Sequence, residues 1–375
     1  SGSQAPQLMH SSVILIAIYR AFNKLLVLIL QYKYTKNMTK DYRIDAFVSL
    51  GSFLQTFKIE NPDNKEHELE QAIVQAKRFN GWFTSENVRA SILEISKLLE
   101  RKKLESWLEN LDETKEVKSV AVIMASNIPL VGFHDFLSVL ISGNKIKIKL
   151  STNDDKLLPC IVNILLEIAP DFKKRIEFSL IKLENFDAVI ATGSDNSAMY
   201  FDSYFGKYPN CIRKSRTSVA ILKGHETLEQ RKELAKDVFQ YFGLGCRNVT
   251  KVYLPTGYDL DLLFEAFFDY KELLMNNKYV NNYDYNKAIY LMGSNKIIEN
   301  GFLIMKEEKG IQSPVSVLHY EFYEDVNSVL SEIEEMKDKI QCVVGQDFIP
   351  FGKAQSPSLE DYADGVNTLD FLKSI

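Results

Sequence analysis

The stretch VKSVAVIMASNIPLVGFHDFLSVLISGNKIKIKLS (117–151) determines the fold. It begins with a short apolar run containing β-branched residues, 117–124, which is typical of a strand buried on both faces. Residues 134–142 then have helical spacing, and 145–150 form a second strand-like run. A strand, a helix and another strand in this order predict the first part of a parallel sheet.

The same alternation continues along the chain. We expect helices at 156–169 and 195–204, and strands at 175–183, 187–193 and 218–223. This pattern predicts a parallel sheet with helices on both faces. No GxGxxG fingerprint occurs, so the sequence lacks the standard dinucleotide-binding turn.

A second α/β unit is expected at about 224–345, because strand-like and helical segments keep alternating there. We predict an N-terminal domain over 38–223, which opens with polar helices at 38–113, and a second domain over 224–345. Residues 346–375 are expected to return to the core. The segments expected in the second domain are helices at 228–242, 258–275, 283–295 and 325–337, and strands at 250–254, 302–306, 315–320 and 340–344.

The first 37 residues differ from the rest of the chain. Their apolar run, 13–30, is nearly long enough to span a bilayer, but Arg20, Asn23 and Lys24 interrupt it. Because Met38 opens an ordinary amphipathic helix, our hypothesis is that residues 1–37 are a non-native or mis-assigned extension. A genuine membrane-associating helix is the alternative.

Composition excludes several classes of function. The chain has 375 residues, 46% of them hydrophobic and 25% charged, which is ordinary for a globular protein. A net charge of −5 provides no basic field for nucleic acid. Four cysteines without paired spacing fit a reducing compartment such as the cytoplasm, and the scattered histidines predict no metal site.

Cys246 is the strongest candidate for a catalytic residue. It lies in GLGCRNVTKVYLP (243–255), between a helical and a strand-like segment, where Gly243 and Gly245 allow a tight turn. Arg247 and nearby backbone amides are expected to favour the reactive thiolate. By contrast, Cys160 and Cys342 occupy apolar runs typical of buried small side chains. The pattern around Cys246 therefore indicates a nucleophile.

Three further segments each have a functional and a purely structural interpretation. Asn127 follows a buried strand and can donate a hydrogen bond to an oxyanion, or it is simply a turn residue before Pro129. Lys149 ends a strand and can reach a ribose or phosphate, or it is a solvated lysine. The turn at 191–198 opens a helix, whose free amides would suit a pyrophosphate.

Together these segments resemble the aldehyde dehydrogenase superfamily. That superfamily has an N-x-P motif, a GN-x5-K motif, a TGS turn and a nucleophilic cysteine, in the order found here. The segments IQSPVSVL and PFGKAQSP resemble its GPV and PFG motifs. The corresponding residues are Asn127, Gly143 to Lys149, Thr192 to Ser194, Cys246, 311–318 and 350–357.

Within the superfamily, the chain is most similar to acyl-CoA reductases of the LuxC type. The longer runs that carry this similarity are 127–140, 212–222, 243–248 and 356–372. The resemblance implies two Rossmann-like domains with the active site at their junction. It also implies NAD(P)H-dependent reduction of an acyl-CoA, with a fatty acyl chain expected, to an aldehyde.

The resemblance also implies roles for individual residues. Cys246 would accept the acyl group, and Asn127 would stabilise the oxyanion. Partners implied are acyl-CoA or an acyl-protein thioester, and coenzyme A; a homo-oligomer stays open. NADPH is the preferred cofactor, with NADH as the alternative, because Lys149 can pair with a 2′-phosphate although Asp154 and Asp155 follow. The residues expected to bind the dinucleotide are Lys149, Ser151, Thr192, Gly193 and Ser194.

One departure from the hydrolytic relatives is chemically informative. Ile212 stands at or near the place of the glutamate that activates water in those enzymes. Without that base, the acyl-cysteine is expected to resist hydrolysis.

The basic cluster Arg213, Lys214 and Arg216 either attracts cofactor phosphates or forms a solvated face. His134 is expected to cap or pack its helix.

Two other functions remain open at this point. The first is a cysteine-dependent acyltransferase or thioesterase, which would use Cys246 without any nicotinamide. The second is a scaffold that binds acyl groups without turnover. The order of the four motifs argues against the scaffold, although resemblance of fold alone does not exclude it.

Overall fold

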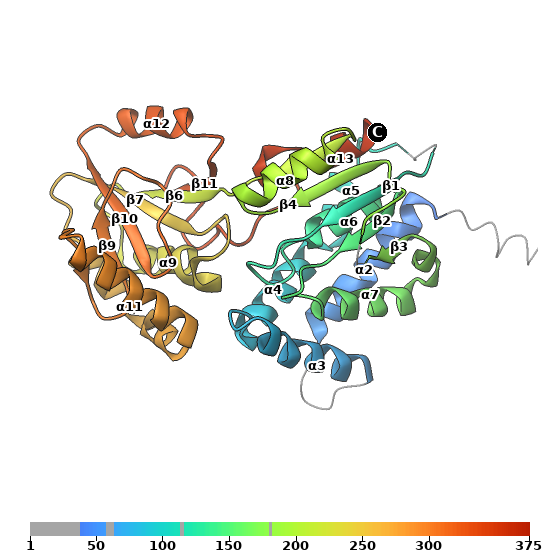
Figure 1. The fold of residues 1–375 in the computed structure, drawn as a ribbon, viewed down its shortest axis with the longest axis horizontal. Helices are drawn as coiled ribbons and strands as arrows, with labels where there is room; N and C mark the ends of the chain where they lie inside the picture. Colours follow the sequence, from blue (N-terminus) through green and yellow to red (C-terminus); the bar gives the residue numbers. More distant parts are fainter. Residues whose placement is uncertain (1–37, 58–63, 113–115, 180–181) are drawn as a thin grey trace, which may run out of the picture.

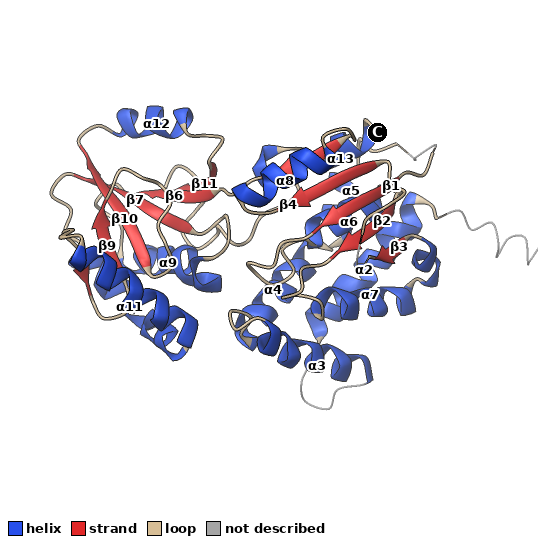
Figure 2. Cartoon of the chain, in the orientation of Figure 1, coloured by secondary structure: helices blue, strands red, loops and turns tan. Residues whose placement is uncertain are grey.

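The computed structural model describes residues 38–57, 64–112, 116–179 and 182–375. The hypotheses about the extension 1–37 and its apolar run lie outside these residues. Two lobes, each built on a mainly parallel sheet, lie side by side (Figures 1 and 2). The predicted α/β class with two Rossmann-like units is therefore confirmed.

The first sheet has the strand order β3-β2-β1-β4-β5, and every neighbouring pair is parallel. The chain starts at the centre, winds outward to β3, and then returns to β4 on the other side of β1. This reversal is the topological switch point at which doubly wound sheets bind ligands. The strands are β1 Ser119–Ile123, β2 Lys145–Lys149, β3 Ile176–Phe178, β4 Ala188–Thr192 and β5 Asn210–Arg213.

Alternating side chains of β1 explain why both faces of this sheet are covered. Val120 and Val122 join a core formed by the N-terminal helices together with α6 and α7. Ala121 packs on the other face, with Val189 of β4 and Phe205 of α8. The part of a strand that is buried on both sides is expected to be apolar, as Val120 to Val122 are here. The helices are α2 Lys40–Thr56, α3 Asn64–Phe79, α4 Ser85–Leu98, α5 Arg101–Trp107, α6 Phe133–Ile141, α7 Leu157–Ile168 and α8 Asp195–Phe205, with η1 Pro170–Lys174.

The second sheet has the order β11-β6-β7-β10-β9-β8, parallel except for the pair β8–β9. Its strands are β6 Thr217–Ile221, β7 Val249–Pro255, β8 Ile298–Glu299, β9 Ile304–Glu307, β10 Val317–Tyr323 and β11 Ile340–Gly345. Its helices are α9 Leu228–Phe239, α10 Asp261–Phe267, α11 Asn277–Met292 and α12 Val326–Glu335, with η2 Gln240–Gly243 and η3 Phe268–Met275.

The prediction that the strand at 218–223 belongs to the first sheet is wrong, because this strand lies in the second sheet. It is β6, and it pairs with β7 and β11 rather than with β5. Only Lys214 to Arg216 separate β5 from β6, so the chain changes sheets there and not after residue 223. Two expected elements are also shorter: the strand at 175–183 covers only Ile176–Phe178, and the helix at 258–275 becomes a 3₁₀ helix after Phe267.

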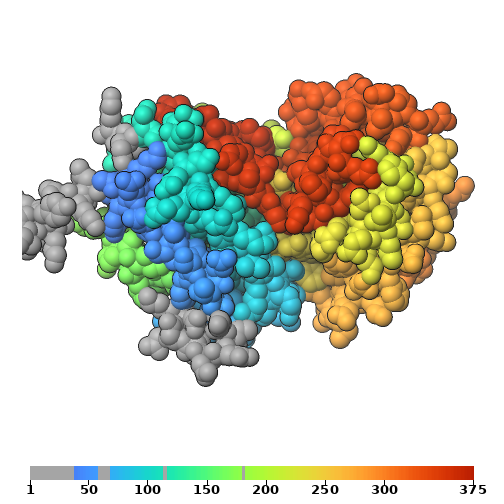
Figure 3. All heavy atoms as spheres, turned by 180° about the vertical axis from the view of Figure 1, so that it is seen from behind, coloured from blue at the N-terminus to red at the C-terminus, as the bar shows by residue number. Residues whose placement is uncertain are grey.

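The C-terminal segment contacts both lobes. Phe351 and Ala354 pack in the core of the second lobe, whereas Leu359 and Leu369 pack in that of the first. Seen from behind, the C-terminal residues in red lie on both sides of the junction (Figure 3). The segment ends with η4 Ala363–Gly365 and α13 Thr368–Lys373. It therefore fastens the two sheets together beside the Cys246 loop.

Candidate active site

The loop that carries Cys246 begins with three consecutive residues in the left-handed backbone conformation. After α9 ends at Phe239, Tyr241, Phe242 and Gly243 have φ values of 54°, 60° and 76°. Glycine adopts this left-handed conformation freely, but Tyr and Phe adopt it at a cost of about 1–3 kcal/mol each. Contacts across the lobes maintain it, because the ring of Phe242 lies 5.3 Å from that of Trp82.

Asn248 clamps the loop from inside. Its Oδ1 accepts a hydrogen bond from the Gly245 N–H at 2.8 Å, and its Nδ2 donates to the Asp237 and Gln240 carbonyls at 3.0 and 2.9 Å. The side chain is fully buried, so each of these bonds is shielded from water. Sequence reasoning did not single out this residue, although it lies two positions after Cys246 in the same run.

The buried carboxylate of Asp237 fixes the C-terminal segment against this loop. It accepts hydrogen bonds from the Gly352 and Ala354 N–H groups, at 2.6 and 2.9 Å. The Ala354 carbonyl in turn accepts a hydrogen bond from Nε of Arg247. Asp237, which no sequence motif marks, thus holds the PFG-like segment at 350–357 beside Cys246.

The Cys246 thiol lines a cavity of about 190 Å³ at the junction of the lobes. Burial raises the pKa of Cys246 to about 11, and the nearby Arg247 lowers it only in part. Arg247 and the Cys246 backbone N–H do lower this pKa, as predicted, but burial outweighs them, so the thiol of the free protein is not activated. Desolvation of the sulfur outweighs the attraction of one guanidinium that is already bonded to Ala354.

This raised pKa predicts a pH dependence for chemical labelling. A thiol is alkylated as the thiolate, whose fraction rises about tenfold per pH unit below the pKa. We expect iodoacetamide to modify Cys246 of the free protein about tenfold faster for each unit between about pH 7 and about pH 9. Peptide mass spectrometry would follow the rate. A plateau already reached near neutral pH would contradict the prediction.

Asn127 lies against the Cys246 loop, as the oxyanion role requires. Its Nδ2 donates to the Leu244 carbonyl at 2.8 Å, two residues before the thiol in the sequence. The side chain is exposed. Its amide is engaged by the loop in this state, so its role as an oxyanion donor stays a prediction.

The residues predicted to bind a dinucleotide gather at the carboxyl edge of the first sheet. Lys149 ends β2, and Thr192 ends β4. Ser151 accepts a hydrogen bond from Ser126 Oγ, which follows β1, at 2.8 Å. Ser194 caps α8 by accepting from the Ser197 N–H. These groups flank the switch point between β1 and β4, where a nucleotide is expected in this topology.

Gly193 allows the turn after β4 to lie close to α8. A Cβ at this position would come within 2.7 Å of Ser197 Cβ. Close approach of backbone to helix is the reason such phosphate-binding turns use glycine.

The two arginines of the basic cluster have neither of the roles considered for it, whereas Lys214 is exposed. Arg213 is buried, and its Nη1 donates to both carboxylate oxygens of Asp135, at 2.7 and 2.6 Å. Arg216 forms an ion pair with Asp364 at 3.2 Å. These arginines join β5 to α6 and to the C-terminal segment; they are neither a solvated face nor available for phosphates.

His134 packs its helix against the C-terminal segment, as expected. Its Nε2 lies 3.0 Å from the Leu359 carbonyl, and its ring contacts Trp107 and Tyr362. Ile212 lies in β5, paired with Ala191.

Within the described residues, no group of three or more His, Cys, Asp and Glu side chains is placed to hold a metal ion. No helix there combines the length and apolar character required to cross a membrane.

Comparison with solved structures identifies the fold as that of aldehyde dehydrogenases. An acetylating aldehyde dehydrogenase from Geobacillus thermoglucosidasius matches with a TM-score of 0.61 at 12% identity, covering 96% of both chains. An indole-3-acetaldehyde dehydrogenase complexed with NAD⁺ matches with a TM-score of 0.60 at 11% identity, covering 82% of this chain and 72% of that one. An NADP-dependent glyceraldehyde-3-phosphate dehydrogenase from Bacillus halodurans, complexed with NADP, gives 0.55 at 13% identity over 82% and 74%.

The family follows from the sequence. The family model described as acyl-CoA reductase (LuxC) matches residues 55–262, which is more than half of the chain. The protein therefore belongs to the acyl-CoA reductase (LuxC) family, and the predicted resemblance is confirmed. No match was found among curated proteins. Family and fold together support an oxidoreductase that acts on acyl groups or aldehydes.

Proposed function

We propose that this protein reduces a fatty acyl-CoA to the aldehyde with NADPH, through an acyl group carried by Cys246. One observation carries the proposal: the thiol lies in a largely apolar cavity, on a loop clamped by Asn248 and adjacent to the nucleotide edge of the first sheet. A nucleophile held in this way can be acylated on one side and face a cofactor on the other.

In the first half-reaction the Cys246 sulfur attacks the thioester carbonyl. The C–S bond to coenzyme A breaks, coenzyme A leaves as a thiol, and the acyl group stays on Cys246. The thiol must lose its proton in this step. The carbonyl oxygen, which becomes negatively charged, would accept hydrogen bonds from the Cys246 N–H and from Asn127 once its amide leaves the Leu244 carbonyl.

A nicotinamide dinucleotide, when bound at the sheet edge, would supply the hydride that reduces the thioester carbon in the second half-reaction. The anionic thiohemiacetal on Cys246 would collapse to aldehyde and the Cys246 thiolate, which takes up a proton from water to restore the thiol. Asn127 and the Cys246 N–H stabilise the oxyanion again in this step. The Asn248 clamp and the Asp237 contacts hold the sulfur in one position through both half-reactions.

The residues at the sheet edge fit a nicotinamide dinucleotide. The strand order places the crevice between β1 and β4, and α8 begins there with Ser194 as its cap. The amides at the start of α8 would receive the pyrophosphate, Ser151 after β2 would receive the ribose, and Lys149 at the end of β2 would receive its 2′-phosphate.

A stoichiometric assay tests this function. We expect purified protein, given hexadecanoyl-CoA and NADPH, to form equal amounts of hexadecanal, free coenzyme A and NADP⁺. Gas chromatography would quantify the aldehyde, and a thiol reagent the coenzyme A. Release of coenzyme A with free acid and no oxidation of NADPH would instead identify a thioesterase.

Lys149→Ala tests the cofactor preference. A lysine that pairs with a 2′-phosphate forms a charged hydrogen bond worth about 1.5–3 kcal/mol, so the variant should bind NADPH more weakly by about tenfold or more while NADH is little affected. Fluorescence titration of both cofactors measures this. Lys145→Ala, at the exposed start of the same strand, is the matched control. Equal losses for NADPH and NADH would place Lys149 on the shared ribose.

A further inference from the structure

The turn between α3 and α4, residues 80–83, is attached to the loop that carries Asn127, and we call it the bridging turn. Asn80 is only 6% exposed, and its Nδ2 donates to the Ser126 carbonyl at 3.0 Å. Its Oδ1 accepts a hydrogen bond from the Trp82 N–H at 3.2 Å. Since Ser126 directly precedes Asn127, the turn is bonded to the backbone that carries the predicted oxyanion donor.

The bridging turn also contacts the second lobe. The rings of Trp82 and Phe242 have centroids 5.3 Å apart, and Phe242 lies four residues before Cys246. The Gly81 carbonyl accepts a hydrogen bond at 3.0 Å from Nδ2 of Asn276, the residue that caps α11. The same four residues therefore hold the start of the Cys246 loop and the Asn127 loop.

The start of the Cys246 loop needs this support because its backbone is strained. Tyr241 and Phe242 have φ values of 54° and 60°, and non-glycine residues keep such a conformation only where the surroundings hold it. Two rings contact Phe242, those of Trp82 and Tyr279, with centroids 5.3 and 6.1 Å away. Phe242 also lines a cavity of about 710 Å³ between the lobes, so atoms on that side do not replace a lost ring.

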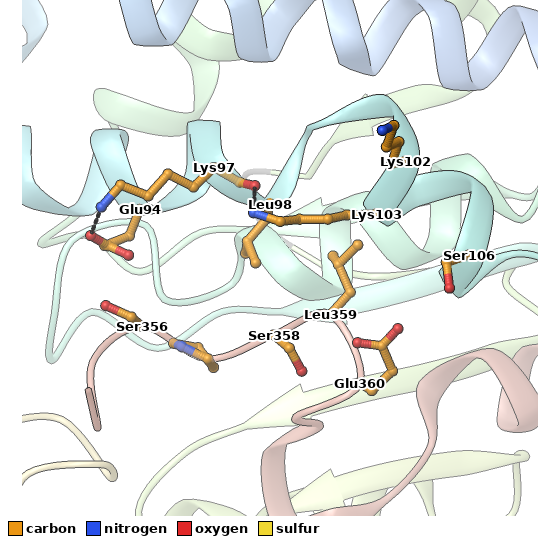
Figure 4. A pocket seen from close by; sticks show the side chains of 11 residues that line it. Glu94, Lys97, Leu98, Lys102, Lys103, Ser106, Ser356, Ser358, Leu359 and Glu360 are labelled. Carbon is orange, nitrogen blue, oxygen red and sulfur yellow. Dashed lines mark hydrogen bonds and ion pairs between the residues drawn. The ribbon is translucent and has the colours of Figure 1, made fainter. Parts of the chain in front are cut away.

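At the other end of α4, the polar contacts stay within the first lobe. Figure 4 shows Lys97 paired with Glu94, and Lys103 donating to the Lys97 carbonyl, at 2.6 and 2.7 Å. A cavity of about 470 Å³ lies between this wall and residues 356–360. Of the two ends of α4, the one at the bridging turn is therefore the end that contacts the second lobe.

We propose that Trp82 and Asn80 are positioning residues for the reaction at Cys246. Through Phe242 on one side and Ser126 on the other, the bridging turn keeps the thiol at a fixed place relative to the nucleotide edge. Hydride transfer requires the reacting atoms to lie about 3–3.5 Å apart. The turn therefore affects this step although none of its residues lines the Cys246 cavity. This inference rests on the proposed function.

Chemical labelling of Cys246 tests the bridge without any turnover. Burial holds the pKa of this thiol at about 11, so a loosened loop should admit water and lower that pKa. We expect Trp82→Ala to raise the rate of iodoacetamide modification at about pH 8 by about tenfold or more, as followed by peptide mass spectrometry. Trp82→Phe keeps a ring beside Phe242 and should restore a rate near that of wild type.

Phe79→Ala is the matched control for labelling. Phe79 ends α3 next to the bridging turn, but it is 50% exposed and contacts Lys156 of its own lobe. This variant should label at the wild-type rate. An unchanged rate in Trp82→Ala would overturn the proposal.

A double-mutant cycle with turnover tests whether Trp82 acts through Phe242. We expect Trp82→Ala to lower kcat for aldehyde formation by about tenfold to 10²-fold. The KM for NADPH should change little, because the nucleotide edge lies in the first lobe, and bound NADPH reports that the variant is folded. Combined with Phe242→Ala, it should cost no more than either single variant.

The outcomes of the cycle separate the bridge from the proposed function. Losses of kcat that multiply in the double variant would overturn the path through Phe242. A wild-type kcat in Trp82→Ala would overturn the positioning role even if labelling becomes faster. If labelling responds as expected but wild type reduces no acyl-CoA of any length, the bridge between the loops stands and it is the proposed function that fails.

Discussion

Cys246→Ala is expected to abolish both thioester cleavage and aldehyde formation. Loss of the nucleophile removes the acyl-enzyme on which both half-reactions depend, so the rate should fall on the order of 10⁴-fold or more. The nucleotide edge is formed by β1, β2 and β4 and does not include the thiol. Binding of NADPH should therefore persist. Release of coenzyme A and oxidation of NADPH, measured separately, check the two half-reactions.

Cys160→Ala is the matched control for this variant. Cys160 lies on α7, packed against the core of the first lobe, and does not line the cavity. Its loss should leave both half-reactions essentially intact. Substantial reductase activity in Cys246→Ala would show that the thiol is not the acyl acceptor. Retained activity could then come only from direct reduction of the bound thioester.

Much of this site follows local signals that a sequence contains. The central run of β1, Val120 to Val122, is apolar because both its faces are buried. In the Cys246 loop, Gly243 is the residue that adopts positive φ without strain. Motifs at the ends of parallel strands meet at the same edge of the sheet. The positions of Lys149, Thr192 and Asn127 at the edge of the sheet can therefore be predicted from the sequence alone.

The supporting residues could not be found in the same way. Asp237 looks like an ordinary surface position on a polar helix, yet its partners Gly352 and Ala354 lie more than a hundred residues further along the chain. Arg213 looks like part of a solvated basic run, but Asp135 makes it a buried ion pair. Both roles depend on tertiary contacts, which no local pattern encodes.

The assignment of β6 failed for a related reason. A short connection between consecutive strands usually keeps them in one sheet. Here the three residues after β5 cross between lobes, where Arg216 is held by Asp364 and by the Lys337 carbonyl. The crossing is stabilised by contacts with the C-terminal part of the chain, which composition and periodicity do not reveal.

In the absence of nicotinamide, we expect an acyl adduct on Cys246 that water removes slowly. Hydrolysis needs a general base, which is commonly worth about 10²–10⁴-fold. Ile212 is an apolar residue of β5, and the resemblance to aldehyde dehydrogenases implies that it replaces the glutamate that activates water in the hydrolytic members. Besides burial, the negative charge of Asp364 helps to raise the pKa of the Cys246 thiol. This carboxylate is near enough to be considered as the general base. However, it is already engaged by Arg216 at 3.2 Å and by the Lys214 N–H at 3.2 Å, so we do not expect it to activate water.

Intact-protein mass spectrometry after mixing with hexadecanoyl-CoA measures this adduct. One added hexadecanoyl group should appear in wild type and none in Cys246→Ala, and its lifetime should exceed the turnover time with NADPH by about 10²-fold or more if base catalysis is lacking. Adding NADPH should discharge the adduct as aldehyde. Adding coenzyme A should instead reform the thioester, because the first half-reaction is reversible. Rapid conversion to free acid would mean that another group activates water, and the protein would then act as a thioesterase despite its family.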